Sequence, residues 1–181
     1  MSDLTIKYYD DNAEAFYDST VNADMSFQYS LFLKHLPKGA YILDLGCGSG
    51  RDSKHFIENG YTVEAIDGSR ELCKKATSLI GQPVKHLMFQ DLDYCNVFSG
   101  VWASASLLHV PPDELPIIFR SVYSALKDNG IFYVSFKLRI AKWTAFYRFH
   151  EGYAFGNARK HWLLQYNRMP RNWRCTARPW Q

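Results

Sequence analysis

Residues 41–50 read Tyr-Ile-Leu-Asp-Leu-Gly-Cys-Gly-Ser-Gly, a short apolar run that breaks into three alternating glycines. The apolar half predicts a buried strand, and residues 51–59 continue with a helical pattern. Glycine lets the backbone turn tightly and approach a ligand closely, because it carries no Cβ. The following helix directs its unpaired N–H groups toward the same turn. The stretch therefore predicts a strand, a turn and a helix that together bind a cofactor.

The spacing of the glycines discriminates between three cofactor chemistries. A phosphate-binding P-loop needs a lysine and a hydroxyl residue after its last glycine, and this chain lacks them. The NAD-binding fingerprint of an oxidoreductase would place its third glycine where Arg51 stands. The pattern present is D-x-G-x-G-x-G, which begins at Asp44. A carboxylate there repels a pyrophosphate but compensates the ammonium of S-adenosylmethionine, whose carboxylate the helix N-terminus receives.

A second acidic residue supports the same cofactor. The predicted strand at residues 61–66 ends at Asp67, about twenty residues after the loop, where a ribose-binding acid is expected. A carboxylate at this place can accept hydrogen bonds from both ribose hydroxyls. A role at the N-terminus of the next helix, favoured by the helix dipole, stays open and is compatible with the first.

Four segments in the appropriate order resemble those of class I S-adenosylmethionine-dependent methyltransferases. The resemblance covers about residues 4–137 and is greatest for the tellurite-resistance-type and generic small-molecule methyltransferase domains. Each segment alone is a common pattern, and the four together carry the resemblance. They are Asp44–Gly50 continuing through Ser53, Ala65–Ser69, Phe89–Asp93 and Ala105–Pro111.

The resemblance implies an α/β, Rossmann-like class I methyltransferase fold with a mostly parallel sheet flanked by helices. In such enzymes the acid after the third strand meets the adenine amino group, and the neighbouring backbone N–H meets a ring nitrogen. Asp91 and Leu92 are the matching positions. The cofactor-binding residues expected for S-adenosyl-L-methionine are Asp44, Gly46, Cys47, Gly48, Gly50, Arg51, Asp67, Gly68, Ser69, Asp91, Leu92 and Ser106.

Three of these positions have an alternative structural role. Arg51 suits either the methionyl carboxylate or a solvated helix surface. Ser106 suits either the methyl and acceptor side of the site or packing of a small residue beneath the helices. Cys47 fits a space-filling role in the loop better than that of a nucleophile. The cysteines and histidines of the chain show no metal-ligand spacing, so no metal site is predicted.

The order of the predicted elements indicates a parallel sheet with right-handed crossovers. In such a sheet the ligand lies beyond the carboxyl ends of the strands, where the strand order reverses. Each of the acids above follows such an end. Strands are expected at 41–45, 62–66, 84–89, 101–104 and 131–136, and helices at 52–59, 69–79 and 113–127, after two N-terminal helices.

The activity expected from the resemblance is in-line transfer of a methyl group to a small molecule or soft nucleophile of the thiol or chalcogen type. The enzyme then contributes alignment and exclusion of water. His109 is the candidate catalytic base, and a polar residue that caps the loop before Pro111 is the alternative role. Tyr8 and Tyr9 suit either an N-terminal lid over the cofactor or packing on a helix face.

The composition changes abruptly after Lys137, which divides the chain into a methyltransferase domain at 1–137 and an atypical basic, aromatic-rich tail at 138–181. The tail holds nine Lys or Arg against one acid, and four of the five tryptophans. The family's helix and two closing strands are not recognisable there, so these strands are expected to be altered or missing. An arm that binds nucleic acid, a divergent folded cap and an out-of-frame segment stay open.

The tail also bears on function. A nucleic-acid-binding methyltransferase and a non-catalytic remnant that only binds the cofactor are the alternatives to a small-molecule enzyme. The N-terminus lacks an apolar signal segment, and no run approaches the roughly 18 apolar residues of a membrane span. We therefore expect a cytoplasmic protein that does not enter a membrane.

Overall fold

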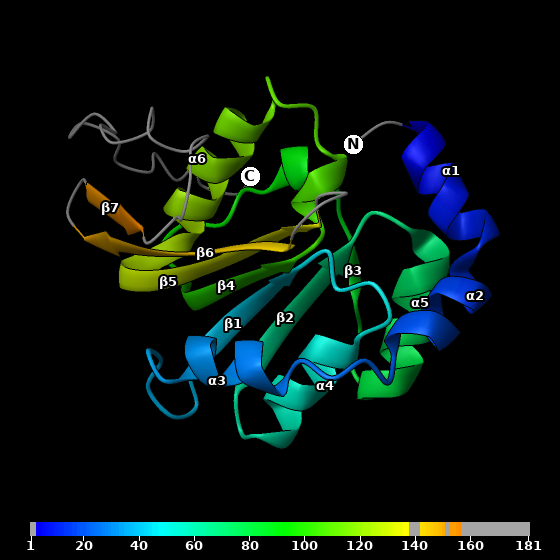
Figure 1. The fold of residues 1–181 in the computed structure, drawn as a ribbon, viewed down its shortest axis with the longest axis horizontal. Coiled ribbons are helices and arrows are strands. Elements are labelled where there is room, and N and C mark those ends of the chain that lie inside the picture. The colour runs from blue at the N-terminus through cyan, green and yellow to red at the C-terminus, as the bar shows by residue number, and fades with distance from the viewer. Residues whose placement is uncertain (1–2, 138–141, 151–152, 157–181) are drawn as a thin grey trace, which may run out of the picture.

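The computed structural model describes residues 3–137, 142–150 and 153–156, and it forms one seven-stranded sheet between helices (Figure 1). The strand order is β3-β2-β1-β4-β5-β6-β7, and the first five strands run parallel. β6 and β7 are antiparallel to their neighbours. The strands are β1 (Tyr41–Leu45), β2 (Thr62–Asp67), β3 (Lys85–His86), β4 (Phe98–Ser104), β5 (Leu126–Lys137), β6 (Lys142–His150) and β7 (Tyr153–Gly156).

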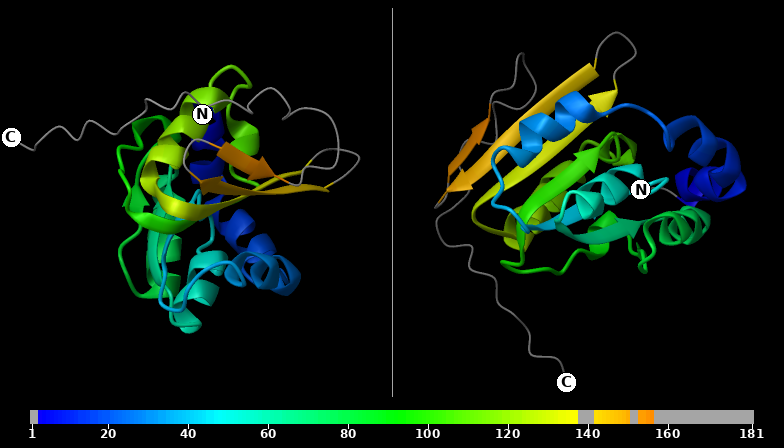
Figure 2. Two further views of the ribbon diagram at one scale, coloured as in Figure 1. Left: turned by 90° about the vertical axis from the view of Figure 1, so that its left-hand side faces the viewer. Right: turned by 90° about the horizontal axis from the view of Figure 1, so that it is seen from below.

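Helices cover both faces of the parallel strands. α6 lies over one face, α3 and α4 lie over the other, and α1 and α2 pack beside α5 (Figures 1 and 2). The predicted Rossmann-like α/β architecture is thereby confirmed. The helices are α1 (Asp3–Asp11), α2 (Ala13–Thr20), α3 (Ser26–Leu33), α4 (Arg51–Glu58), α5 (Arg70–Ile80) and α6 (Leu115–Ala125), with 3-10 turns η1 (Phe89–Asp91) and η2 (Leu107–His109).

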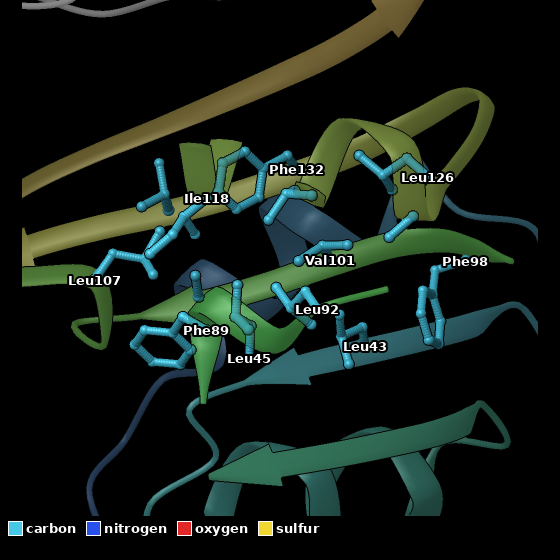
Figure 3. Close-up of a cluster of buried hydrophobic side chains, with 14 of the residues drawn as sticks. Leu43, Leu45, Phe89, Leu92, Phe98, Val101, Leu107, Ile118, Leu126 and Phe132 are labelled. Atoms are coloured by element: carbon cyan, nitrogen blue, oxygen red, sulfur yellow. The ribbon is translucent and has the colours of Figure 1, made fainter. Parts of the chain in front are cut away.

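Alternating side chains along each strand build two hydrophobic cores, one on each face of the sheet. In β1, Ile42 packs on the face of α3 and α4, whereas Leu43 packs on the face of α6. In β4, Trp102 likewise packs on the face of α3 and α4, and Val101 packs on the face of α6. Strands buried on both faces read as continuous apolar runs, which is why the sequence pattern identified them. Figure 3 shows the core beneath α6.

Helix and strand boundaries differ from the expected ones mainly around β5. The helix expected to run to residue 127 ends at Ala125, and the strand begins immediately at Leu126 instead of at residue 131. Two backbone hydrogen bonds, from Asn96 to Ser124 and from Val97 to Ala125, tie this end to the segment before β4. The pairing register then shifts between Phe98 and Gly100, and Asn129 adopts the left-handed conformation. Asn129 therefore interrupts a strand ladder rather than ending a helix.

The C-terminal strands are present in an altered arrangement. Four residues separate β5 from β6, and the two strands pair antiparallel from Ile131 opposite Arg148 to Lys137 opposite Lys142. β7 then pairs with β6. The edge of β5 is therefore covered, and the exposed edge that an unpaired tail would have left is not formed. Of the basic, aromatic-rich tail expected at 138–181, residues 142–150 and 153–156 form these two strands, its other residues lie outside the described ones, and the domain boundary at 137 stays a prediction.

Two isoleucine-to-alanine substitutions in α6 should show how much of the stability comes from burial of a side chain and how much from helix propensity. Ile118 has no exposed surface, whereas its neighbour Ile117 is 56% exposed. We expect Ile118→Ala to lower the free energy of unfolding by about 3 kcal/mol, because the truncated side chain leaves a cavity. Ile117→Ala is the control and should change it by less than about 0.5 kcal/mol. Urea denaturation of both variants measures the difference, and equal effects would contradict this core assignment.

Candidate functional site

The three glycines of the loop between β1 and α4 adopt a backbone conformation that side chains disfavour. Gly46, Gly48 and Gly50 have φ angles of 80°, 56° and 83°. A Cβ on Gly46 would lie 2.5 Å from the Cβ of Ser106, and one on Gly50 would lie 2.9 Å from the Cβ of Ala76. The sequence predicted glycine here because the backbone must approach a ligand closely. The structure shows that glycine is also needed because the loop packs closely against other residues of the protein.

A cavity opens over this loop, at the carboxyl ends of β1, β2 and β4. Of the residues predicted to form the site, the structure brings five to the cavity wall. They are Gly46, Gly48, Asp67, Ser106 and His109. The position agrees with the rule that ligands of open α/β sheets lie beyond the carboxyl ends of the strands.

Among the described residues that line this cavity, Asp67 is the one ionisable carboxylate. Its Oδ2 accepts a hydrogen bond from the Gly48 N–H at 2.8 Å, and its Oδ1 accepts one from the Ser69 N–H at 2.9 Å. Burial raises the pKa of this carboxyl group, and the backbone N–H donors partly oppose that shift. Each oxygen keeps a further lone pair that can accept a hydrogen bond from a ligand. Gly68, which the sequence also predicted for the site, is the residue between Asp67 and Ser69 in the chain.

Asp44 lies beneath the loop and is outside the lining of the cavity. Its side chain is buried, and Oδ2 accepts a hydrogen bond from Ser53 Oγ at 2.6 Å. Burial, and then repulsion from Asp52, raise the pKa of Asp44 to about 8. A positive charge placed over the loop would favour the ionised form of this carboxyl group. The predicted compensation of a ligand ammonium by Asp44 stays a prediction.

Arg51 points away from the cavity, toward Asp52. Its Nε donates to Asp52 Oδ1 at 2.6 Å, and one terminal nitrogen donates to the Thr20 carbonyl at 3.3 Å. Asp52 also accepts hydrogen bonds from the Tyr29 hydroxyl and, at 2.8 Å, from Trp102 Nε1. The guanidinium thus completes a buried polar cluster and borders a second depression formed by residues 21–26 and α4.

Other predicted residues surround the cavity without lining it. Asp91 is exposed at the end of η1, and Leu92 is buried in the core beneath α6. Cys47 is buried in the opposite core, where burial raises the pKa of its thiol and keeps it unreactive. Ser69 is buried and caps α5, because its Oγ accepts from the Leu72 N–H at 3.1 Å. Their roles toward a cofactor stay predictions.

The N-terminal helices contribute Tyr9, which the sequence offered as a lid residue, and two residues that the sequence did not assign to the site, Ile6 and Phe16. Ile6, Tyr9 and Phe16 line the cavity from α1 and α2. Asp10 fastens α1 to the start of α5, because its Oδ1 accepts hydrogen bonds from Ser69 Oγ at 2.6 Å and from the Glu71 N–H at 3.2 Å. The helical spacing of the apolar residues is visible in the sequence, but spacing cannot say which surface a helix covers.

An ion pair also ties α1 and α2, which together form the lid of the cavity, to α5. Glu14 of α2 pairs with Lys75 of α5, and the Lys75 ammonium lies 5.2 Å from the centre of the Tyr17 ring. Across the cavity, the Tyr9 hydroxyl lies 2.7 Å from His109 Nε2. Tyr9 lines the cavity and also packs against the Phe16 ring, so its role as a lid over the cofactor stays a prediction, whereas Tyr8 is 61% exposed.

The wall opposite the lid follows β4. Ser106 Oγ donates to the Leu45 carbonyl at 2.6 Å, so this hydroxyl ties the end of β4 to the end of β1. Ala105 has a φ of 53°, which costs a residue with a Cβ about 1 kcal/mol or more. His109 is half-buried, and burial lowers the pKa of its imidazole below 6.5, so the ring is neutral at pH 7.

Comparisons with known proteins agree with this geometry. Residues 42–130, which include the glycine loop and β1 to β5 as far as Gly130, match the family model described as a methyltransferase domain. The chain belongs to the class I S-adenosylmethionine-dependent methyltransferase family. The resemblance stated from four sequence segments is thereby confirmed at the level of the family. Its tellurite-resistance subgroup stays a prediction.

Three individual proteins show how far this methyltransferase resembles its relatives. An uncharacterized methyltransferase of Staphylococcus carnosus is 28% identical over 122 residues, which are 63% of this chain and 59% of that protein. A methyltransferase structure from Methanosarcina mazei is 27% identical, with a TM-score of 0.56, and the match covers 59% of this chain and 57% of that one. A TehB-like methyltransferase structure from Corynebacterium glutamicum shares the fold, with a TM-score of 0.61, 18% identity and coverage of 76% of both chains.

The chain spans between 32% and 59% of the length of the curated relatives that it matches.

Within the described part of the chain, no group of three or more metal-ligating side chains is close enough to hold an ion. Across the same residues, no helix has both the length and the apolar composition of a membrane span.

Substituting alanine at two glycines should separate steric conflict from backbone strain. Gly46 and Gly60 have similar φ angles of 80° and 82°, but no atom lies within 4 Å of a Cβ added to Gly60. We expect Gly60→Ala to lower the free energy of unfolding by about 1 kcal/mol, because its left-handed backbone disfavours alanine. Gly46→Ala should cost at least about 1 kcal/mol more, because it also displaces Ser106. Chemical denaturation tests this, and equal losses would contradict it.

The buried carboxyl group of Asp44 should make stability depend on pH. Its pKa is raised from 3.8 to about 8 on folding, so between these values the folded chain keeps a proton that the unfolded chain has lost. The contribution of Asp44 to stability therefore falls as the pH rises through this window. We expect the melting temperature of Asp44→Asn, relative to the parent, to increase from pH 5 to pH 9. A difference that is independent of pH would contradict the assignment.

Proposed function

We propose that this protein transfers the methyl group of S-adenosylmethionine to a small-molecule acceptor. The observation that carries the proposal is the cavity itself, in which the glycine loop, the Asp67 carboxylate and the end of β4 face one another. When bound, S-adenosylmethionine supplies a methyl group on an electrophilic sulfonium. The contributions of the protein are then binding, alignment and exclusion of water.

The cavity offers groups for each part of the cofactor. Asp67 suits the ribose hydroxyls, because both of its oxygens are held in place by backbone N–H donors. Gly46 and Gly48 present backbone to the methionyl part, with Asp44 as a buried counter-charge beneath them. Leu72 and Phe89 supply apolar surface for the adenine. Asp91 and Leu92, close to Phe89 in the chain, remain the proposed partners of the adenine edge.

The lid supports the proposed exclusion of water. α1 reaches from α5, which Asp10 contacts, to η2, where Tyr9 meets His109, and Glu14 of α2 adds an ion pair to α5. A methyl donor of this reactivity is transferred efficiently when water is removed and the acceptor is aligned with the bond that breaks. His109 is the proposed base, and a neutral imidazole at pH 7 suits that role.

The acceptor proposed from the family resemblance is a small molecule, with a thiol or chalcogen as the favoured nucleophile. The alternative acceptor, a nucleic acid, rests on the basic residues of 138–181, whose side chains lie outside the described part of the chain. A cofactor-binding remnant without activity would bind the same ligand and methylate no acceptor.

Substitution of the ribose-binding acid tests the cofactor assignment. We expect Asp67→Asn to weaken binding of S-adenosylhomocysteine about 10- to 100-fold, because hydrogen bonds to a charged acceptor contribute about 1.5–3 kcal/mol. Asp93→Asn removes an exposed carboxylate that does not line the cavity and is the matched control. Isothermal titration calorimetry measures both affinities, and Asp91→Ala tests the adenine contact separately. Tighter binding of NAD than of S-adenosylhomocysteine would refute the methyltransferase proposal.

A further inference from the structure

We propose that Tyr9 and His109 form a proton relay, in which the Tyr9 hydroxyl takes the proton of a neutral thiol or phenol acceptor and passes its own proton to His109 Nε2. The inference rests on the proposed function and names the acceptor class of the same site. It makes Tyr9, a residue of the lid, a catalytic residue in contact with the acceptor.

The first support is the hydrogen bond between the two side chains. The Tyr9 oxygen lies 2.7 Å from His109 Nε2, and 100 residues of chain separate the two. With a neutral imidazole whose Nε2 accepts from the tyrosine, the lone pair at the tip of the ring is engaged. The acceptor therefore meets the tyrosine oxygen, which still has lone pairs, rather than the imidazole nitrogen.

The second support is the charge of the cavity wall. Among the described residues that line the cavity there is one carboxylate, Asp67, and there is neither lysine nor arginine. The described wall offers a preformed thiolate, phenolate or carboxylate no cation of its own, and such an anion would face the Asp67 carboxylate with only the sulfonium of the cofactor to attract it. Such a wall favours an acceptor that arrives neutral and loses its proton only within the site.

The third support is the apolar surface beside the tyrosine. Ile6 and Phe16 line the cavity next to Tyr9, and the Phe16 ring meets the Tyr9 ring edge to face at 5.1 Å between centroids. This surface matches an acceptor with an apolar or aromatic body. An alkyl or benzylic thiol, or a phenol without electron-withdrawing groups, is neutral at pH 7, and its weakly acidic proton needs a base before or during transfer.

The ionisable neighbours of the pair are consistent with a relay. Tyr8 and Asp67 face Tyr9 and, with burial, raise the pKa of its hydroxyl, so Tyr9 keeps its proton in the resting site. Burial lowers the pKa of His109, so the imidazole is ready to receive a proton. Tyr9 therefore acts as a donor that is re-protonated by the acceptor, and His109 acts as the final base.

The proposed step balances in atoms and charge. The acceptor uses an electron pair to form its bond to the methyl group, and the bond from methyl to sulfur breaks with its pair left on sulfur as a neutral thioether. The acceptor proton moves to the Tyr9 oxygen while the Tyr9 proton moves to His109 Nε2. The resulting imidazolium returns its proton to water when the product leaves.

A pair of aryl and benzylic thiols tests the relay through the protonation state of the acceptor. 4-Nitrothiophenol is ionised at pH 7, whereas benzyl mercaptan is protonated. We expect Tyr9→Phe and His109→Gln to lower kcat/KM for benzyl mercaptan about 100-fold and to change that for 4-nitrothiophenol less than about 3-fold. Tyr8→Phe is the matched control, since it removes an exposed hydroxyl from the adjacent position and should leave both values unchanged.

The contrary outcomes identify which claim fails. Equal losses on both thiols would overturn the relay and leave Tyr9 a packing residue of the lid. A parent protein that binds S-adenosylhomocysteine but methylates neither thiol would overturn the acceptor class while the cofactor site stands. Absence of S-adenosylhomocysteine binding would instead overturn the proposed function.

Nuclear magnetic resonance of the imidazole gives a readout that does not depend on turnover. A tyrosine that donates to neutral His109 stabilises the neutral ring, so Tyr9→Phe should raise the pKa of His109 toward its ordinary value. Titration of the ring nitrogen shifts in the parent and in the Tyr9→Phe variant measures this. An unchanged pKa would overturn the relay.

Discussion

The rest of this structure depends on a bend that has no room for a Cβ. Gly46 turns the chain at the end of β1 with a φ of 80°, directly against Ser106 at the end of β4. The same bend sends the chain into α4, whose start at Gly50 packs on Ala76 of α5. A side chain at either glycine would separate the strand ends that carry the cavity. Shape and function are therefore set by the same steric constraint.

Two carboxyl groups, those of Asp44 and Asp52, are buried beneath the bend. Burial of Asp44 and Asp52 is unfavourable, and the protein compensates it with specific partners. Ser53 donates to Asp44, whereas Arg51, Tyr29 and Trp102 donate to Asp52. The raised pKa of Asp44 means that part of this cost remains. A cationic ligand above the loop would offset it, which links the affinity of the site to the stability of the fold.

The N-terminal lid joins two otherwise separate parts of the site. α1 is fastened to α5 through Asp10, and it meets η2 through Tyr9 and His109. The helix thereby places an aromatic hydroxyl and apolar side chains over the end of the cavity where an acceptor must enter. Since the wall there lacks a positive side chain within the described residues, the chemistry of the lid favours a neutral acceptor. Water exclusion and acceptor choice then have a common structural origin.

The sequence by itself determined the parallel strands, the glycine loop and the family, because strands buried on both faces and a left-handed bend leave local patterns that no other structure requires. It also indicated Asp67, whose place after β2 follows from strand order. Tertiary structure decided which candidates meet in the cavity. Arg51 turns to Asp52, Asp91 stays exposed, and Tyr9 crosses to His109, because side-chain direction depends on packing between segments far apart in the chain. Local periodicity carries no information about such contacts.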